Sequence, residues 1–282
     1  MSYKLVAIDI DGTLLNSNHV IPEENIETIR QLREKGVSFV IVTGRPDTAV
    51  KEYVETLGIN APVLGCNGAS IRDVLTGKIH SLKTIPNDIL IKLYEFFHSR
   101  NIYPRYYSLD SVYSFNTDEF NEAVNPFAVF SKRLAGMMSF KVIKDIDFLL
   151  KWDTKIVKVV YITEEYETIA PIQEELRKIP GIEALRSTKT GLDIFADDVS
   201  KGKALLSYAE SLGIKKEEII AIGDGENDLS MLEAVGFPVT LKNGEEALKE
   251  IAKFVSNDEA GVAKALKKIY KYNEDSGDYD GV

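Results

Sequence analysis

Two acidic residues lie two positions apart after the first apolar segment of the chain. Residues 4–10 have a pattern typical of a buried strand, and Asp9 and Asp11 stand at its carboxyl end, followed by Gly12. Alternate residues of a strand point to the same side, so both carboxylates leave it together. Carboxylates placed in this way can attack an electrophile, exchange protons with a substrate or hold a cation. An acidic turn in which Gly12 supplies an unusual backbone angle is the simpler alternative.

A second acidic segment, residues 223–228, has the sequence Gly-Asp-Gly-Glu-Asn-Asp. It follows an apolar strand pattern and precedes a helical one. Asp224 and Asp228 supply the hard oxygen ligands that Mg²⁺ prefers, and Asn227 adds an amide. Glycines and acids after a strand can also form a turn with a helix N-cap. The segment therefore indicates a Mg²⁺ site if the fold brings it to Asp9.

Four more residues could bind a phosphoryl group. Thr43 and Gly44 follow the apolar run at residues 37–42, Asn67 follows the next apolar run, and Lys201 begins a helical pattern. A helix N-terminus attracts anions, and a phosphoryl site needs a fixed cation such as Lys201. Each residue also has a simpler role: Thr43 as a helix N-cap, Asn67 in a turn and Lys201 as a solvated first-turn residue.

Separate segments reach one place only if the fold brings them there. The first eighty residues alternate short β-rich runs with helical patterns, which is typical of right-handed βαβ units on a parallel sheet. The expected strands and helices are residues 4–10, 22–36, 37–42, 46–57 and 62–66. The carboxyl ends of parallel strands meet at one edge of the sheet, where ligands bind in open α/β folds. All the residues above fall at such ends or at the start of a helix, and this convergence is the strongest indication of a site.

The middle of the chain has a different texture. Residues 84–188 contain a long helical pattern, two aromatic-rich segments and a strand–helix pair, which together indicate a separate α+β unit. The alternation of buried strands and helices returns afterwards. The simplest architecture is an α/β fold with one doubly wound parallel-sheet core, residues 1–83 and 189–272, and an inserted α+β domain. Residues 273–282 carry four acids and no base, and we expect them to be disordered.

The composition argues against several functional classes. A formal charge of −10 argues against a nucleic-acid binder, since backbone phosphates are bound by clustered Lys and Arg. The longest apolar runs have strand length and fall short of the roughly 18–20 residues that a membrane span needs. A single cysteine, Cys66, leaves no internal disulfide and no thiolate cluster for zinc. We therefore expect a cytoplasmic protein with a small molecule as its partner. No pattern indicates an oligomeric state.

The order of the motifs resembles that of the haloacid dehalogenase superfamily. The motifs are Asp-x-Asp-Gly-Thr at residues 9–13, Thr-Gly-Arg at 43–45, Ser-Lys-Gly at 200–202 and Gly-Asp-x-x-Asn-Asp at 223–228. Asn-Gly-Ala at residues 67–69 makes the chain similar to the Cof-type sugar-phosphatase branch. The place of the insert, between the second and third motifs, resembles the type-two (C2B) cap of that family. The resemblance implies a Rossmann-like core with an α+β cap, and a soluble Mg²⁺-dependent phosphohydrolase.

The resemblance also implies a role for each motif residue. Asp9 would be the nucleophile, and Asp11 would act as acid and then base. Mg²⁺ would be held by Asp9, the backbone carbonyl of Asp11 and Asp224, with Asp228 in support. The residues that would bind the phosphoryl group or order its ligands are Gly12, Thr43, Gly44, Asn67, Lys201 and Asn227.

Substrate recognition would fall to the insert. Arg105 and Tyr107 lie in one of its aromatic-rich segments and are candidates for substrate specificity, although packing within the cap is the simpler explanation. The expected reaction is hydrolysis of a phosphate monoester of a small metabolite. Mg²⁺ and Lys201 would cancel charge while Asp9 takes the phosphoryl group as an aspartyl phosphate.

Three other functions fit part of the pattern. A phosphomutase or other phosphoryl transferase would use the same scaffold and pass the phosphoryl group to a sugar hydroxyl instead of water. A receiver-like signalling domain also gathers acids, a Thr and a Lys on a doubly wound sheet, but it is normally about half as long. An inactive binding module would lack some catalytic groups, and here every candidate group is present.

Overall fold

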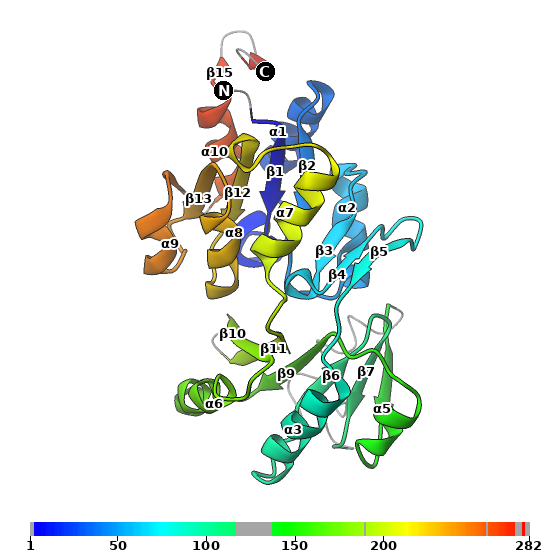
Figure 1. Cartoon of the computed structure of the whole chain (residues 1–282). Coiled ribbons are helices and arrows are strands. Elements are labelled where there is room, and N and C mark those ends of the chain that lie inside the picture. Colours follow the sequence, from blue (N-terminus) through cyan, green and yellow to red (C-terminus); the bar gives the residue numbers. More distant parts are fainter. Residues whose placement is uncertain (1–2, 117–136, 189, 258, 274–277, 280–282) are drawn as a thin grey trace.

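The computed structural model describes residues 3–116, 137–188, 190–257, 259–273 and 278–279. Figure 1 shows two stacked parts: a core, in which helices flank a parallel sheet, and below it a cap built on a second sheet. The chain enters the cap after β5 (Ile79–Leu82) and returns to the core between β11 (Gly191–Ala196) and α7 (Lys201–Ser211). Segments from both sides of the insert therefore build the core.

Five parallel strands form the core sheet, in the order β14-β13-β12-β1-β2. The strands are β1 (Leu5–Ile8), β2 (Ser38–Ile41), β12 (Ile219–Gly223), β13 (Phe237–Leu241) and β14 (Phe254–Ser256). Every residue of β1 and β12 is buried, as expected for apolar strands covered on both faces. These two strands are neighbours, with Ile8 opposite Ile222. Asp9 and the acidic segment after β12 therefore start side by side, although they are far apart in the sequence.

Helices cover both faces of the core sheet. Helices α1 (Glu23–Glu34), α2 (Lys51–Leu57) and α10 (Gly261–Ile269) pack on one face, and α7, α8 (Leu229–Glu233) and α9 (Glu246–Ile251) pack on the other. In α1, the buried Ile29 and Leu32 repeat with the helical period and contact the sheet. The expected α/β class with a doubly wound parallel-sheet core is confirmed.

The expected third strand of the core is a strand, but it belongs to another sheet. β3 (Val63–Gly65) joins β4 (Ser70–Arg72) and β5 in a small antiparallel sheet. A single parallel bridge beyond the end of β2 links β3 to the core sheet. Directly after β3 the chain turns back through Cys66 and Asn67, which both have positive φ. The turn leaves Asn67 at the same edge of the molecule as the carboxyl end of β2.

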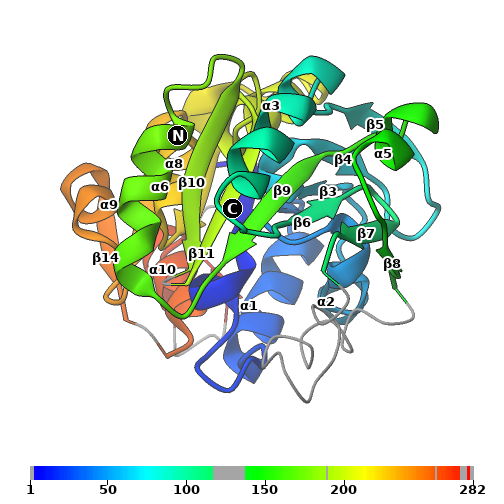
Figure 2. The same cartoon turned by 90° about the horizontal axis from the view of Figure 1, so that it is seen from below.

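The cap is a six-stranded sheet with helices on the side away from the core (Figure 1, Figure 2). Its strands, in the order β10-β11-β9-β6-β7-β8, are β6 (Arg105–Tyr107), β7 (Ser111–Ser114), β8 (Ser139–Val142), β9 (Lys158–Ile162), β10 (Ile182–Thr188) and β11. The helices are α3 (Asn87–His98), α5 (Asp147–Lys151) and α6 (Ile169–Leu176). Tyr106 and Val159 face the helices and join the apolar core of the cap. Arg105, Tyr107 and Lys158 alternate with them and leave the sheet on the side of the core.

One boundary of the insert differs from the expectation. The predicted end at residue 188 falls inside the hairpin of β10 and β11, because β11 pairs with both β10 and β9. Leu192 and Ile194 of β11 also lie in the apolar core of the cap. A buried strand has the same apolar pattern in either part, so the sequence alone does not assign β11. We therefore propose that the cap ends after β11.

The C-terminal segment forms a short antiparallel pair, β15 (Tyr272–Asn273) with β16 (Asp278–Tyr279). Composition predicts disorder for residues 273–282, whereas the structure pairs part of this segment, and its other residues lie outside the described part of the chain. Within the described residues, no helix combines the length and apolar character that a membrane crossing requires.

Candidate active site

Asp9 stands where β1 ends, at the carboxyl edge of the core sheet. Its backbone N–H donates to the carbonyl of Ile222 at 3.0 Å and continues the ladder with β12. The chain then leaves strand geometry in a turn over Ile10–Leu14, in which Gly12 has φ +77°. A Cβ at Gly12 would lie 2.2 Å from Asp224 Oδ2, so a side chain here would strain the backbone and collide with the second acidic segment. The close approach of the two acidic segments thus requires glycine at this position.

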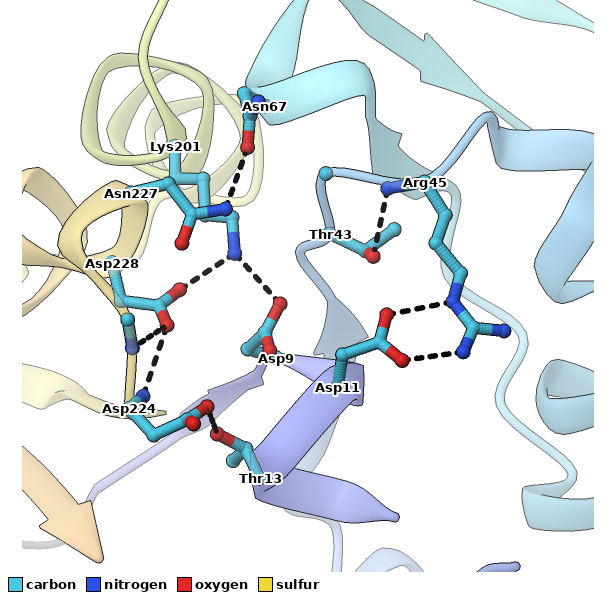
Figure 3. Close-up of polar contacts among 12 residues, drawn as sticks. Asp9, Asp11, Thr13, Thr43, Arg45, Asn67, Lys201, Asp224, Asn227 and Asp228 are labelled. Carbon is cyan, nitrogen blue, oxygen red and sulfur yellow. Dashed lines mark hydrogen bonds and ion pairs between the residues drawn. The ribbon is translucent and has the colours of Figure 1, made fainter. Parts of the chain in front are cut away.

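Lys201 is buried between two carboxylates. Its Nζ donates to Asp9 Oδ1 and to Asp228 Oδ1, each at 2.6 Å (Figure 3). The side chain comes from the first turn of α7, where the Ser200 hydroxyl accepts from the backbone N–H of Lys203 and caps the helix. Lys201 is therefore not a solvated first-turn residue. It fixes the orientation of Asp9.

Burial shifts the proton affinity of this cluster. Desolvation alone would lower the pKa of Lys201, but Asp228 and Asp9 outweigh it and hold that pKa above its usual value. Burial raises the pKa of Asp9 well above that of a free aspartate, although Lys201 opposes this shift. Burial also raises the pKa of Asp224 to about 6, against the opposing hydrogen bond from Thr13. Several clustered carboxylates thus face one ammonium, and this imbalance favours a bound cation.

The acidic segment after β12 holds its side chains through its own backbone. Asp228 Oδ2 accepts from the N–H groups of Asp224 and Gly225, at 3.0 and 3.1 Å. Asp224 in turn accepts from the Thr13 hydroxyl at 2.7 Å (Figure 3). One carboxylate oxygen from each of Asp9, Asp224 and Asp228 lies within 4.8 Å of the others. Oxygen ligands gathered in this way suit Mg²⁺.

A second group of polar residues lies next to the buried carboxylates in Figure 3. Asn227 Nδ2 donates to Asn67 Oδ1 at 3.0 Å. A Cβ at Gly44 would lie 3.1 Å from Asn67 Oδ1 and 3.4 Å from Asn227 Nδ2, so these three residues pack closely. Thr43 is buried, and its hydroxyl accepts from the backbone N–H of Arg45 at 3.1 Å. The fold therefore brings four of the six expected phosphoryl-binding residues together from three separate segments.

Asp11 does not share the buried cluster. Its side chain is 49% exposed and is turned toward Arg45, whose Nε and Nη2 both donate to the carboxylate (Figure 3). Arg45 also donates to the hydroxyl of Tyr53 at 3.3 Å. The carboxylate of Asp11 is thus separate from the group formed by Asp9, Asp224 and Asp228.

The cap residues singled out from the sequence face the core. Arg105 and Tyr107 are both buried on the core-facing side of the cap sheet. Tyr107 packs in an apolar cluster that includes Cys66 of the core, and Lys158 Nζ lies 5.2 Å from the centre of its ring. Both residues therefore occupy the side of the cap that a substrate in the core would meet, and Tyr107 also contributes packing.

Known proteins resemble this chain over almost its whole length. A family model described as haloacid dehalogenase-like hydrolase matches residues 6–266, a span that contains every motif. The chain belongs to this family. Among its relatives, the 5-amino-6-(5-phospho-D-ribitylamino)uracil phosphatase YwtE of Bacillus subtilis is 32% identical, and the match covers 94% of this chain and 98% of the relative.

Solved structures of the family agree with the fold. A haloacid dehalogenase-like hydrolase from B. subtilis has a TM-score of 0.80 at 30% identity, covering 94% of this chain and 99% of that one. The subclass IIB sugar phosphatase BT4131 has a TM-score of 0.78 at 26% identity, covering 94% and 98%. These matches confirm the expected superfamily, its Cof-type branch with a type-two cap, and the class of phosphoric monoester hydrolase.

Sequence reasoning missed three residues that contact members of this candidate site. Asn243 Nδ2 donates to the Gly12 carbonyl at 2.9 Å and to Asp224 Oδ2 at 3.1 Å. Asn243 follows β13, so the same search for polar groups at carboxyl ends of core strands would have found it. Lys158 and Asp193 of the cap contact Gly44 and Asn67 of the core. The sequence feature that could have indicated both residues is a single charged residue in an otherwise largely apolar strand.

Proposed function

We propose that this protein is a Mg²⁺-dependent phosphatase that hydrolyses phosphate monoesters of small metabolites through an aspartyl phosphate at Asp9. The observation that carries the proposal is the buried cluster in which Lys201 fixes Asp9 beside Asp224 and Asp228. A carboxylate held in one orientation at the carboxyl edge of the sheet is suited to in-line attack on a bound substrate.

The donor groups of this cluster fit Mg²⁺. Asp9, Asp224 and Asp228 would hold the ion, together with the backbone carbonyl of Asp11. Burial raises the pKa of Asp9 and of Asp224, which means that their negative charges lack full compensation within the protein. When bound, Mg²⁺ would neutralise charge on the carboxylates and on the phosphoryl group, so that a phosphate dianion can approach Asp9.

In the first half-reaction, a carboxylate oxygen of Asp9 would attack phosphorus in line with the leaving group. The new O–P bond forms as the bond from phosphorus to the ester oxygen breaks. Asp11 would protonate the departing alkoxide. To do so its side chain must leave Arg45, which donates two hydrogen bonds to it in this structure.

In the second half-reaction, Asp11 would act as a base. It would take a proton from a water molecule that attacks phosphorus, entering where the leaving group departed. The bond from phosphorus to Asp9 then breaks, inorganic phosphate leaves and the carboxylate is restored. The same residue can serve both steps because the second is the chemical reverse of the first, with water in place of the alcohol.

The other motif residues would hold the phosphoryl group during transfer. Lys201 supplies positive charge beside Asp9. Thr43 offers a hydroxyl, and Gly12 and Gly44 offer backbone N–H groups. The Asn227 amide donates one N–H to Asn67 and has a second for a phosphoryl oxygen.

The substrate is, in this proposal, a small phosphorylated metabolite. YwtE is named for a phosphorylated ribitylaminouracil and BT4131 is named as a sugar phosphatase. The charge of −10 supports such a substrate over nucleic acid. The single cysteine fits the reducing cytoplasm, which is the location we propose. Arg105 and Tyr107 face the core from the cap and would contact the leaving group.

The configuration at phosphorus tests the covalent step. Two in-line displacements each invert phosphorus, so hydrolysis through Asp9 should give net retention. Direct attack by water would give inversion. A substrate made chiral with sulfur and oxygen isotopes, hydrolysed in labelled water, reports the outcome, and the release of inorganic phosphate rather than a second phosphate ester distinguishes a phosphatase from a phosphomutase. Inversion would leave Asp9 as a metal ligand only and would overturn the proposal.

A further inference from the structure

Two charged residues of the cap form a buried ion pair that belongs to none of the motifs. Lys158 lies on β9 and Asp193 on the neighbouring β11, and Lys158 Nζ is 2.9 Å from Asp193 Oδ2. Their side chains are 7% and 3% exposed. Burial removes both charges from water, so such a pair needs further hydrogen bonds to compensate.

These further hydrogen bonds are made with the core. Lys158 Nζ donates to the backbone carbonyl of Gly44 at 2.7 Å, and Asp193 Oδ2 accepts from Asn67 Nδ2 at 2.9 Å. Asn67 Oδ1 accepts in turn from Asn227 Nδ2 at 3.0 Å. The pair thus reaches three of the residues to which the proposed function assigns the phosphoryl group.

Asp193 dictates the direction of each amide in this series. A carboxylate only accepts hydrogen bonds, so Asn67 must turn its Nδ2 to Asp193 and its Oδ1 to Asn227. Asn227 then donates one N–H to Asn67 and keeps the other for a different acceptor. If the Asn67 amide were reversed, two donors would face each other and the bond to Asn227 would be lost.

Lys158 is a charged donor to Asp193. Burial alone would lower the pKa of Lys158, but Asp193 outweighs this effect and raises it, so the ammonium stays charged beside the carboxylate. Both members of the pair come from the cap, whereas the amides that they orient come from the core. The orientation of these amides therefore requires the cap to rest on the core.

We propose that Lys158 and Asp193 are positioning residues that couple cap closure to the phosphoryl site. With the cap closed, they fix the amide of Asn67 and, through it, the free N–H of Asn227. This inference rests on the proposed function, because it assigns the direction of that N–H to the binding of a phosphoryl group.

Inhibition by inorganic phosphate tests the coupling, with p-nitrophenyl phosphate as the reporter substrate and Mg²⁺ present. Asp193→Asn gives Asn67 a partner that can donate or accept, so the amide is no longer fixed. The inhibition constant of phosphate and the KM should both rise about 10-fold or more, as is typical when a residue that orients a ligand is removed. In an Asn67→Ala background, the same substitution should add little, because the residue through which it acts is gone.

Arg177→Ala is the matched control. Arg177 of the cap donates to Glu226 of the core at 3.0 Å, so its loss also removes a cap–core contact but leaves Asn67 untouched. This control should leave the inhibition constant of phosphate unchanged. An equal rise in Arg177→Ala, or an unreduced effect of Asp193→Asn without Asn67, would overturn the positioning role.

A second variant covers the case in which Asp193→Asn unfolds because Lys158 keeps an unpaired buried charge. Lys158→Met combined with Asp193→Leu removes both charges at similar volume and should fold, yet it should raise the inhibition constant in the same way. A folded double variant that binds phosphate as the wild type does would refute the proposal. Wild-type protein that neither hydrolyses the reporter nor binds phosphate would instead refute the proposed function.

Discussion

Asp9 and Asp11 are only two residues apart, and their surroundings are opposite. Asp9 is 5% exposed, and its carboxylate is fixed by Lys201 within a group of acids. The side chain of Asp11 is 49% exposed and is bound by Arg45 on the far side of the turn. The partners of Asp9 come from the second half of the core, whereas the partner of Asp11 comes from the segment after β2.

This difference matches the two tasks in the proposed mechanism. A nucleophile must stay at one position relative to phosphorus, and burial against a fixed ammonium gives Asp9 that position. A residue that gives a proton and later takes one must reach both the leaving group and water, and Asp11 lies where solvent has access. The following predictions test whether the buried and exposed carboxylates divide the work in this way.

Asp9→Asn should have the largest effect on turnover. The amide keeps the shape of the side chain and can still accept from Lys201, but it is not a nucleophile, so kcat on p-nitrophenyl phosphate should fall about 10⁴-fold or more. Circular dichroism should show an intact fold. Asp88→Asn changes an exposed acid of α3 and is the control with full activity expected. Near-normal turnover of Asp9→Asn would make the nucleophile assignment wrong.

Removal of Mg²⁺ should have the next largest effect, because it leaves the negative charges of Asp9, Asp224 and Asp228 without a compensating metal ion. We expect kcat/KM to fall on the order of 10³-fold in chelator and to return with excess Mg²⁺. The melting temperature gives a second readout, since an ion that binds only the folded cluster stabilises it. Asp224→Asn should lose most of that Mg²⁺-induced rise. Full activity of metal-free protein would contradict the proposed site.

Asp11→Asn should act more weakly and should depend on the leaving group. Loss of a general acid typically lowers the rate about 10²- to 10⁴-fold when the leaving group needs a proton. An alkyl phosphate should therefore lose about 10²-fold or more in kcat/KM, whereas p-nitrophenyl phosphate, whose leaving group departs unprotonated, should lose far less. Asp9→Asn should affect both substrates alike. Equal losses in Asp11→Asn would argue against its role as an acid.

Local patterns were sufficient to predict most residues of the candidate site. Asp9, Thr43 and Asp224 follow apolar strand patterns, and the carboxyl-edge rule needs only these patterns to place them together. The same rule would also have predicted Asn243, which follows β13. The sequence made Lys201 only a candidate for binding the phosphoryl group, because the pattern of a helix start does not distinguish a buried lysine from a solvated one.

Contacts between distant segments lay beyond such reasoning. The pairing of Asp11 with Arg45 depends on how two loops meet. The hydrogen bonds that link Lys158 and Asp193 to Asn67 depend on the register of β9 with β11. Register and docking are set by three-dimensional packing, which one sequence does not reveal. The same reason applies to the boundary predicted at residue 188, because the apolar pattern of β11 would suit either sheet.

The smallest expected effect concerns the stability of the protein, and it measures how unfavourable the buried charge of Asp224 is. Burial raises the pKa of Asp224 to about 6, above the value near 4 that an unfolded chain shows. Between these values the folded state binds more protons than the unfolded state, so this group makes stability fall as the pH rises through that window. The loss approaches about 2–3 kcal/mol above pH 6 in metal-free protein. Asp224→Asn has no such group, so its free energy of unfolding relative to wild type should rise by about 2 kcal/mol between pH 4.5 and pH 7.5, measured by urea denaturation. Saturating Mg²⁺ should reverse the ranking, because the ion binds the carboxylate form of the wild type. A difference in free energy of unfolding that stays constant with pH in metal-free protein would mean that the pKa of Asp224 is not raised. The buried and exposed acids would then differ in position but not in proton affinity.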